Sequence, residues 1–232
     1  VESPVGESTV LTTDDGSYTA HQDVAVFDRG HMNPKEKMKD METITQPEWV
    51  QTMEDNEKHY GEPRWRYLKN VVYRHHGNKE IIIAVIRGDL EVNKAKVEHA
   101  LNAVGQLEDA TADDLAKIGT KTGYVHSWGH AAKYIGDLSL ESVRNFIGGQ
   151  KEAGNDTTNV NYGRDFQCDQ LADIAMAKAG HATKKGEVLR ELTGIEVGNI
   201  FQLGTHYSSL MKAVFADEDG QGWRKKINLK LQ

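Results

Sequence analysis

The sequence predicts a mixed α+β fold in which antiparallel strand pairs alternate with short helices. Residues 66–75 and 80–88 are rich in apolar and β-branched residues, and residues 76–79 between them carry turn residues. This arrangement is typical of a β-hairpin. A second hairpin is predicted near the N-terminus, because an Asp-Gly turn signal precedes an apolar stretch, with its second strand near Tyr18–Phe27.

Short helices are predicted where capping residues precede helix-forming segments. Residues 93–101 begin with Asn93 as a plausible N-cap. Residues 111–119 begin with Thr111 as N-cap, carry acidic residues in the first turn, and end with Gly119 as C-cap. The first of these helices begins within a few residues of the predicted strand at 80–88.

The other segments give weaker signals. Residues 28–64 are charged and contain three prolines, so we expect a connector with one or two short helices, the second starting at Gln46-Pro47-Glu48. Further strands are expected in the core of the loop 122–130, at 134–137 and at 157–166. A helix is expected to begin at the N-cap Ser139 and to end at Gly148 and Gly149, and residues 171–180 form either a helix or an irregular run. Residues 192–216 are expected to form a strand, a glycine turn and a helix.

Composition limits the classes of protein that this chain can represent. The 232 residues carry a formal net charge of -7, which fits one large or two small domains and argues against a broad nucleic-acid surface. Local contact stays open, because basic residues cluster at 64–74 and 224–226. No run approaches the ~18 apolar residues of a membrane span. Cys168 is the only cysteine, which excludes an intrachain disulfide and fits a reducing cytosol.

The tripeptide Arg87-Gly88-Asp89 ends a strongly apolar run and allows three interpretations. A cell-adhesion signal needs an exposed loop, and a buried strand in a cytosolic type of chain argues against it. A phosphate-binding turn and a simple strand-to-helix corner both stay open. The corner is favoured, because Gly88 permits a positive φ and Asp89 can accept backbone N–H groups.

Histidines invite a metal interpretation that the spacing does not favour. His75 and His76 are adjacent on a predicted strand, so they point to opposite faces. His126 and His130 have an i, i+4 spacing, but Gly129 lies between them in a predicted loop, whereas metal-binding pairs of this spacing stand on helices. We therefore expect no metal site.

Lys69 and a glycine-bounded loop are the remaining candidates. A lysine between Leu68 and Val71 is unusual if buried and would then suit a phosphate or carboxylate, although an outward-facing strand lysine is the simpler interpretation. The stretch from Gly123 to Gly129 can place backbone N–H groups around an anion or carbonyl, or can be a tight connection. The sequence contains no P-loop, dinucleotide-binding motif or evident activated nucleophile.

Two segments resemble bacterial prolyl-tRNA synthetases specifically. GIEVGNIFQLGTHYS at 194–208, followed by FADEDG at 215–220, resembles the segment before motif 3, and VIRGDLEVNKAKVEHAL at 85–101 resembles the editing insertion. Further similar segments follow in the family's order over nearly the whole chain. The class II signature motifs and the anticodon-binding domain are absent, and the first residue is not Met, so we expect a fragment: the insertion with short flanking pieces that cannot charge tRNA alone.

The resemblance implies a fold, a domain division and a function. The expected fold is α+β with a central, mostly antiparallel sheet and surrounding helices. Residues 1–27 would be flanking strands of the synthetase domain, 28–64 a connector, 65–172 the editing core and 173–232 the return segment. The family hydrolyses alanyl-tRNA made in error for proline, because a proline pocket cannot strongly exclude the smaller alanine.

The resemblance also implies site residues. Lys69 matches the lysine needed for editing and would hold the terminal adenosine or its phosphate. Residues 123–127 match a Gly-x-x-x-Pro loop that lines the aminoacyl pocket, with Ser127 in place of proline, and Asp137 matches an acidic residue after the next strand. The implied catalytic residues are Lys69, Gly123, Ser127, Gly129 and Asp137, and the implied substrate-binding residues are Tyr124, Val125, His126, Asn155 and Asp156.

Two departures leave alternatives open. A family histidine that helps to set amino-acid specificity is replaced near Asn155 and Asp156, and Asn199 stands where many members have histidine. The mechanism would be attack by water, assisted by the substrate's ribose hydroxyl, with N–H groups of the loop 123–129 stabilising the oxyanion. The alternative is a degenerate insertion that serves as a structural or tRNA-binding module.

The expected partners follow from the parent enzyme. They are the acceptor end of tRNA(Pro) and the rest of the synthetase, in a homodimer in the cytoplasm and away from membranes. Editing would need no cofactor, whereas the parent synthetase would use ATP and Mg to attach proline.

Overall fold

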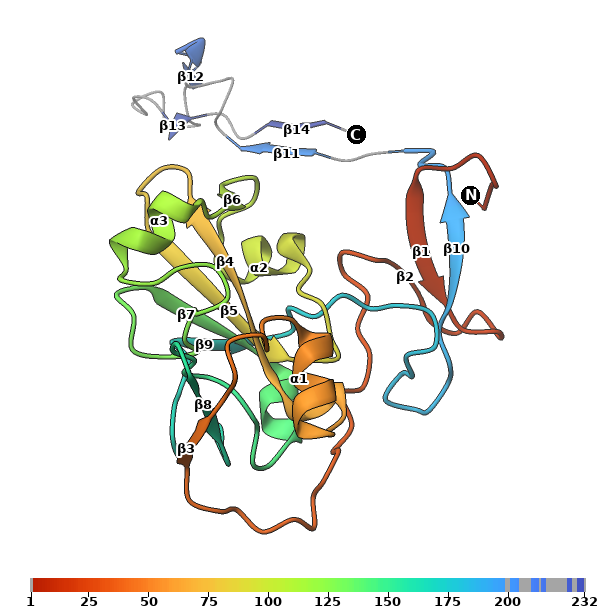
Figure 1. Cartoon of the computed structure of the whole chain (residues 1–232). Helices are drawn as coiled ribbons and strands as arrows, with labels where there is room; N and C mark the ends of the chain where they lie inside the picture. Colours follow the sequence, from red (N-terminus) through yellow and green to blue (C-terminus); the bar gives the residue numbers. More distant parts are fainter. Residues whose placement is uncertain are drawn as a thin grey trace. The chain divides into compact units, whose positions relative to one another are not determined.

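The central element of the computed structural model is a five-stranded sheet (Figure 1). The structure describes residues 2–198 and, beyond them, 201–204, 210–212, 214–215, 225–226 and 229–231. The chain divides into two units, Val10–Glu191 and Val1–Thr9 with Leu192–Gln232. The sheet lies in the first of these units. Its strand order is β6 (Leu107–Asp109), β4 (Leu68–His75), β5 (Ile81–Arg87), β7 (Lys133–Asp137) and β9 (Gln170–Ala172).

The predicted hairpin forms, but the sheet is mixed. β4 pairs antiparallel with β5 and β6, whereas β7 pairs parallel with both β5 and β9. The expectation of a mostly antiparallel sheet therefore understated the parallel pairs, which arise because long connections separate β5 from β7 and β7 from β9. Every residue of β5 is buried, which explains its unbroken apolar run. The α+β class is confirmed.

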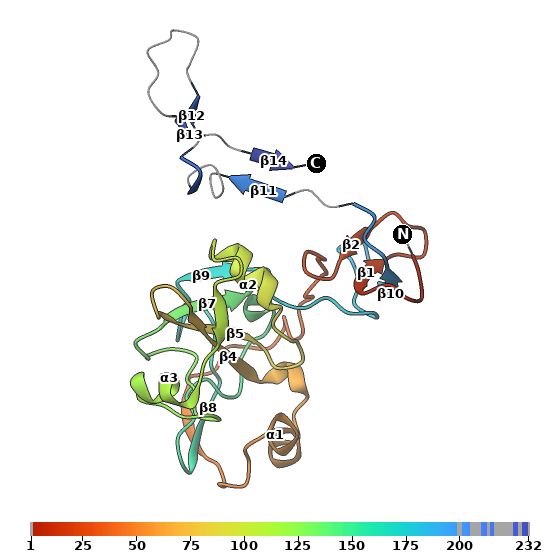
Figure 2. The same ribbon diagram turned by 90° about the horizontal axis from the view of Figure 1, so that it is seen from above.

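Two apolar layers cover the two faces of the sheet. Ile83 and Val85 of β5 pack with Leu68 of β4 and with Phe146 and Val160. The alternate residues Ile82 and Ala84 pack on the other face with Val97 of α2 (Lys94–Ala100). Figure 2 shows α2 on one side of β4 and β5, with β8 (Asn155–Thr158) on the other. The alternation follows from the period of two in a strand.

The two capped helices are confirmed. The side chain of Asn93 accepts the N–H of Lys96 at 3.2 Å at the start of α2. Thr111 and Asp114 form a reciprocal capping box at the start of α3 (Ala112–Lys117). Gly119 follows the C-cap residue Ile118 with a φ of 77°. Local side-chain chemistry is sufficient to define these boundaries.

The connector differs from its prediction in two ways. Its helix α1 (Met53–Tyr60) begins after Thr52, which forms a capping box with Asp55, so Pro47 does not start it. It ends at Gly61, whose left-handed φ of 68° suits glycine. The connector also contains a strand that the sequence analysis missed, β3 (Glu42–Thr45), which pairs antiparallel with β8. Long-range pairing of this kind leaves little local signal.

The helix predicted from Ser139 to Gly148 is wrong. A short 3-10 helix, η2 (Leu138–Ser142), begins after Asp137, whose Oδ1 accepts the N–H of Ser139 at 2.8 Å. Beyond it, Phe146 exchanges backbone hydrogen bonds with Val160. The buried positions 140, 143 and 146 imitate helical spacing, but the backbone groups of Phe146 pair with the distant Val160 instead. The loop 122–130 likewise contains no strand, and residues 173–180 are irregular.

The first and last strands are short. The N-terminal hairpin is confirmed, with β1 (Ser8–Thr12) antiparallel to β2 (Thr19–His21), although its second strand ends before Phe27. Beyond residue 189 the described strands are β10 (Arg190–Gly194), β11 (Phe201–Gly204), β12 (Val214–Phe215), β13 (Lys225–Lys226) and β14 (Leu229–Leu231). A short 3-10 helix, η1 (Arg64–Arg66), precedes β4.

The C-terminal expectations are tested only in part. Strand β12 occupies 214–215, inside the helix predicted to run to 216, and is antiparallel to β13, as β11 is to β14. Asn199 and much of that predicted helix lie outside the described residues. Among the described residues, no helix is long and apolar enough to cross a membrane.

Candidate active site

A cavity of about 270 Å³ opens beside the start of β4. Four segments line it: 51–56 around the start of α1, 67–70, the loop at 123–125, and 147–156. Of the ten residues predicted for the site, the cavity brings together Lys69, Gly123, Val125 and Asp156. The others occupy the surrounding structure, and their positions define what each can do.

Lys69 lies on β4, opposite Ile86 of β5. It is half-buried, and its Nζ donates a hydrogen bond to the carbonyl of Leu90. Burial lowers the pKa of Lys69, and the charge of Glu91 opposes this effect. Lys69 is therefore a lining residue of the cavity with a partly desolvated ammonium, a point charge of the kind that suits an anionic phosphate.

Asn70 was missed by the sequence analysis, although its side chain bonds to two residues of the loop 123–129. Because successive strand residues point to opposite faces, Asn70 leaves β4 on the side opposite to Lys69. Its Nδ2 donates to the carbonyl of Val125 at 2.8 Å, and its Oδ1 accepts from Ser127 Oγ at 2.9 Å. An amide inside an apolar strand beside Lys69 was the available signal.

Ser127 is fully buried rather than exposed to substrate. Its backbone N–H donates to the carbonyl of Gly149 at 2.6 Å, and its hydroxyl is engaged with Asn70. It does not line the cavity. Ser127 thus joins the loop to β4 and to the segment around Gly149, and its predicted catalytic role stays a prediction.

The glycine loop offers fewer N–H groups than predicted. The N–H groups of Tyr124 and His126 donate to Lys121 O and His130 Nε2, both at 3.0 Å. Within the described residues, the N–H groups of Gly123 and Val125 have no hydrogen-bond partner. Gly123 and Gly129 have φ values of 84° and 91°, a left-handed conformation that favours glycine. Gly129 does not line the cavity.

Gly149 contributes a further backbone donor that the sequence analysis interpreted as a helix stop. Its φ is 117°, and a Cβ at this position would lie 2.5 Å from the ring of Trp128. Trp128 in turn stacks on Phe166 with ring centroids 5.0 Å apart. In the part of the chain that the structure describes, the Gly149 N–H donates to no other group. Close packing therefore restricts this position to glycine, and Gly149 is one of the residues that line the cavity.

Asp156 supplies a buried carboxylate to the cavity. Its Oδ1 accepts the N–H of Thr157 at 2.8 Å, and its Oδ2 accepts from Gln46 Nε2 at 3.1 Å. Burial raises the pKa of Asp156 to about 6. Lys151, which also lines the cavity and was not predicted, lowers that pKa through its charge. Asn155 is exposed and does not line the cavity, so the predicted pair divides into one site residue and one surface residue.

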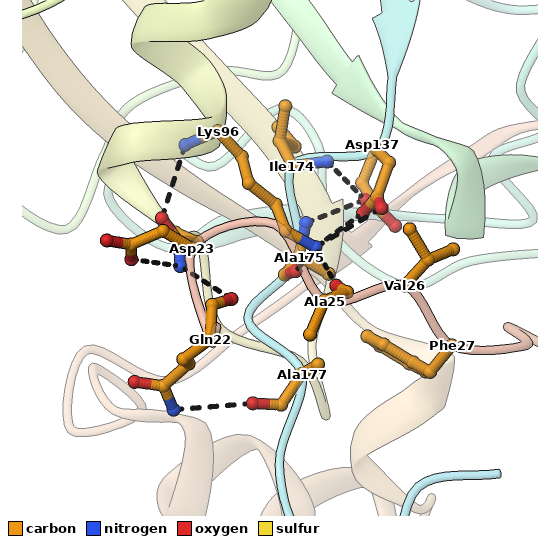
Figure 3. A network of polar contacts seen from close by, with 12 residues as sticks. Gln22, Asp23, Ala25, Val26, Phe27, Lys96, Asp137, Ile174, Ala175 and Ala177 are labelled. Carbon is orange, nitrogen blue, oxygen red and sulfur yellow. Dashed lines mark hydrogen bonds and ion pairs between the residues drawn. The ribbon is translucent and has the colours of Figure 1, made fainter. Parts of the chain in front are cut away.

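Asp137 belongs to a buried network instead of the cavity (Figure 3). Its carboxylate accepts the N–H groups of Ile174 and Ala175, both at 3.0 Å, and is paired with Arg29 at 3.0 Å. Burial acts to raise the pKa of Asp137, but the hydrogen bonds and charge of Arg29 hold it below its usual range. Figure 3 shows Lys96 meeting the same segment, where its Nζ donates to the carbonyl of Ala175 at 2.9 Å.

This network holds the return segment against the sheet. Arg29 also pairs with Asp173, and Lys96 donates to Asp173 at 3.1 Å. The Asp137 carboxylate contacts the Arg29 guanidinium and the N–H groups of Ser139, Ile174 and Ala175, and its predicted catalytic role stays a prediction. A buried carboxylate satisfied in this way stabilises its partners.

Residues 87–89 form the predicted corner after β5, but the contacts that hold it differ from those predicted. Gly88 does not have a positive φ; a Cβ there would lie 2.6 Å from the carbonyl oxygen of Arg64. Asp89 accepts the guanidinium of Arg87 at 2.6 and 3.0 Å rather than backbone N–H groups. The corner thus brings β5 close to η1 at the edge of the cavity.

The histidine pair 126 and 130 faces a second hollow of about 390 Å³. Their ring centroids lie 4.8 Å apart, and His130 Nδ1 lies 3.2 Å from the carbonyl of Ile118. Within the residues that the structure describes, no group of three or more His, Cys, Asp or Glu side chains could hold a metal ion. The predicted residues Tyr124 and His126 line this hollow and not the cavity.

Comparison with protein families agrees with the position of the cavity. The model of the aminoacyl-tRNA editing domain matches residues 47–166, just over half of the chain and a range that includes all four lining segments. The chain belongs to the aminoacyl-tRNA editing domain family. The resemblance stated from the sequence is confirmed, and this editing domain is related to prolyl-tRNA synthetases.

The curated relatives are longer proteins. The proline–tRNA ligase of Fusobacterium nucleatum is 37% identical over 218 residues, covering 93% of this chain and 38% of that protein. The proline–tRNA ligase of Thermotoga maritima is 32% identical over 223 residues, covering 95% and 38%. The editing domain chain thus spans well under half of their length.

Among solved structures, one described as a candidate trans-editing enzyme for prolyl tRNA synthetase has a TM-score of 0.47 and 14% identity, over 59% of this chain and 87% of that one.

Proposed function

We propose that this chain is the editing module of a proline–tRNA ligase and hydrolyses mischarged alanyl-tRNA(Pro). The observation that carries the proposal is the composition of the cavity. It combines an ammonium at Lys69, a buried carboxylate at Asp156, and N–H groups of Gly123, Val125 and Gly149 that have no partner in the described structure. An aminoacyl ester presents a phosphate-linked nucleoside, an α-ammonium and a carbonyl, which these three features match in charge and polarity.

The bond to be broken is the ester between the amino acid and the terminal ribose. Water attacks the carbonyl, assisted by the neighbouring ribose hydroxyl, and the ribose oxygen leaves as the carboxylate forms. The N–H groups of Gly123, Val125 and Gly149 stabilise the developing oxyanion. We propose no protein nucleophile, because the two candidate side chains are poorly suited to attack the ester. The Ser127 hydroxyl is buried and bonded to Asn70, and burial raises the pKa of the Cys168 thiol to about 12.

Asp156 recognises the α-ammonium of the amino acid in this proposal. A carboxylate that is buried and keeps acceptor capacity makes a charge-assisted hydrogen bond with an ammonium group. Its charge sets a requirement for substrates with a free amino group. Asp156 occupies the segment where the family carries a histidine that helps to set amino-acid specificity. We therefore expect the amino-acid specificity of this chain to depend on Asp156.

Lys69 positions the nucleotide end of the substrate. Its ammonium is tied to Leu90 by one hydrogen bond and has two further N–H groups for an anion. Correct placement of the ester against the backbone donors is worth several orders of magnitude in rate for well-oriented reactions. Asp137 and Ser127 support the site from outside it.

The wider context is part of the same proposal. The parent enzyme attaches proline to tRNA(Pro) with ATP and Mg as a cytoplasmic homodimer, while the editing step uses water alone. Residues 65–172 are the proposed editing core, with 1–27 and 173–232 as parts of the synthetase domain. The connector 28–64 contributes the segment 51–56 to the cavity lining.

Deacylation assays test this function. The chain is incubated with alanyl-tRNA(Pro) and with prolyl-tRNA(Pro), and release of each amino acid is compared with release in buffer. We expect alanine release well above background and little release of proline. Equal release of both amino acids would contradict the editing specificity, and release of neither would contradict hydrolysis.

A second candidate function is a degenerate insertion that binds tRNA without hydrolysis. It is favoured by one observation, namely that Lys69 already donates to the Leu90 carbonyl while Ser127 and Asp156 depart from the family pattern. Binding of uncharged tRNA(Pro) together with no alanine release would support this candidate over the first.

A further inference from the structure

The second hollow adjoins the cavity and shares a residue with it. We call it the Tyr124 groove; its lining includes Lys121, Tyr124, His126, Lys151 and Glu152. Lys151 lines both the groove and the cavity, so the two spaces meet at this side chain. A substrate that fills the cavity and extends beyond Lys151 would therefore enter the groove.

The groove combines aromatic faces with positive charge. Lys121 Nζ lies 4.6 Å from the centroid of the Tyr124 ring, and the ring of His126 is partly exposed beside it. Glu152 is the acidic side chain among the residues that line the groove, and it is exposed. Aromatic platforms beside lysines are the usual means by which proteins hold single-stranded nucleic acid without reading its sequence.

Lys151 stands where a phosphodiester would have to pass. Its side chain is half-buried, and its Nζ donates to the carbonyl of Val50, which leaves two N–H groups for another acceptor. A lysine held between two adjoining spaces is a fixed point charge that suits a phosphate oxygen.

We propose that the Tyr124 groove binds the nucleotide preceding the terminal adenosine, with its base stacked on Tyr124 and the phosphate between the two nucleotides bound to Lys151. This inference rests on the proposed function, because it requires the aminoacyl adenosine to occupy the cavity. It assigns the tRNA contact to a lysine and a tyrosine side chain outside the predicted catalytic set.

The test uses two substrates that differ by the internucleotide phosphate. Alanyl-tRNA(Pro) contains it, and alanyl-adenosine does not. The variants are Tyr124→Leu and Lys151→Gln, the latter keeping a donor for Val50. Lys94→Gln is the matched control, since Lys94 is exposed on α2, which packs on the other face of the sheet.

For both variants we expect kcat/KM on alanyl-tRNA(Pro) to fall about tenfold more than kcat/KM on alanyl-adenosine, mainly through KM. Lys151→Gln also lowers the dependence of binding on salt concentration, because one phosphate contact is lost. Lys94→Gln leaves both substrates unaffected. Equal losses on the two substrates, or no loss on either, would overturn the groove assignment.

Binding of the uncharged trinucleotide C-C-A separates this inference from the proposed function. Protein fluorescence or NMR titration reports binding without any need for hydrolysis. Weaker binding by Tyr124→Leu and Lys151→Gln than by the wild type supports the groove even if no ester is hydrolysed. Equal binding by all variants overturns the groove even if hydrolysis is found.

Discussion

The carboxylate of Asp156 makes the stability of this editing domain fall as pH rises, a direction opposite to that of most acidic residues. Burial raises its pKa from an ordinary 3.8 to about 6. The folded state therefore binds the proton more tightly than the unfolded state does. The associated stability is present in full below about pH 4 and is lost as pH rises through about 6.

The magnitude follows from the size of the shift. Each pKa unit corresponds to about 1.4 kcal/mol, so a rise of about two units costs the folded state about 3 kcal/mol at neutral pH. Asp156→Asn removes this cost at every pH. The amide loses the hydrogen bond with Gln46 or Thr157, which gives an offset that does not vary with pH. The difference in unfolding free energy between variant and wild type should thus move in favour of the variant by about 2 kcal/mol between about pH 4.5 and 7.5.

Urea unfolding of both proteins across this pH range measures the difference directly. Glu36→Gln is a control of opposite sign: although burial acts to raise it, hydrogen bonds from Asn145, Arg66 and Asn33 lower the pKa of Glu36 to about 2, so its stabilisation is lost as pH falls. The reasoning is refuted if the Asp156→Asn difference is flat across the range or moves toward the wild type. In the deacylation assay, the same variant should lose about tenfold in kcat/KM for alanyl-tRNA, through the lost contact with the ammonium group.

Three further predictions concern the surroundings of the cavity. Lys69→Gln keeps a donor for the Leu90 carbonyl but removes the charge, so deacylation should fall about tenfold or more with little change in urea midpoint, whereas Lys69→Ala should lower both; unchanged deacylation would exclude Lys69 from the site. Gly88→Ala should cost roughly 1–3 kcal/mol of stability, because its Cβ meets the Arg64 carbonyl at 2.6 Å, and a neutral result by urea unfolding would contradict this packing. Asp137→Asn should lower the free energy of unfolding by about 3–5 kcal/mol, because it removes a charged partner of the buried Arg29. The protein that circular dichroism shows to be folded should keep its deacylation rate. Folded but inactive protein would instead support a catalytic role for Asp137.

The parts of the fold that were predicted correctly depend on local chemistry. Asn93 and Thr111 each bond to the backbone N–H three residues further along, so the sequence near them contains all the information that fixes the helix start. The hairpin of β4 and β5 is joined by a short turn, which fixes its register almost locally.

Where the prediction failed, distant segments competed for the same backbone. Residues 139–148 have helical spacing of apolar side chains, yet Phe146 pairs with Val160 and Ile147 N–H donates to Arg66 O. The missed strand β3 pairs with β8, more than a hundred residues further along the chain. Spacing alone cannot distinguish a buried helix from a buried extended segment of this kind.

The candidate site shows the same division between local and distant information. Lys69 and the Gly123 loop were named because single residues stood out in their segments or matched a family. Asn70, Lys151 and Gly149 become site residues only through the packing of the loop on β4 and of Trp128 over Gly149. A sequence read one segment at a time gives no indication of such contacts.

Asp137 was predicted to be catalytic from its position and its family match, and its surroundings in the structure argue for a structural role. An acidic residue directly after a buried strand is a common position for a catalytic group, and the resemblance pointed the same way. The structure surrounds this carboxylate with the Arg29 guanidinium and three backbone N–H groups, from Ser139, Ile174 and Ala175. These donors stabilise the charged form, and Asp137 does not line the cavity, so we expect it to hold the return segment rather than to take part in the reaction. At Asp156, by contrast, burial outweighs the two hydrogen-bond donors and raises the pKa. The charged form of this carboxylate is therefore incompletely stabilised, and we expect a substrate ammonium to stabilise it further.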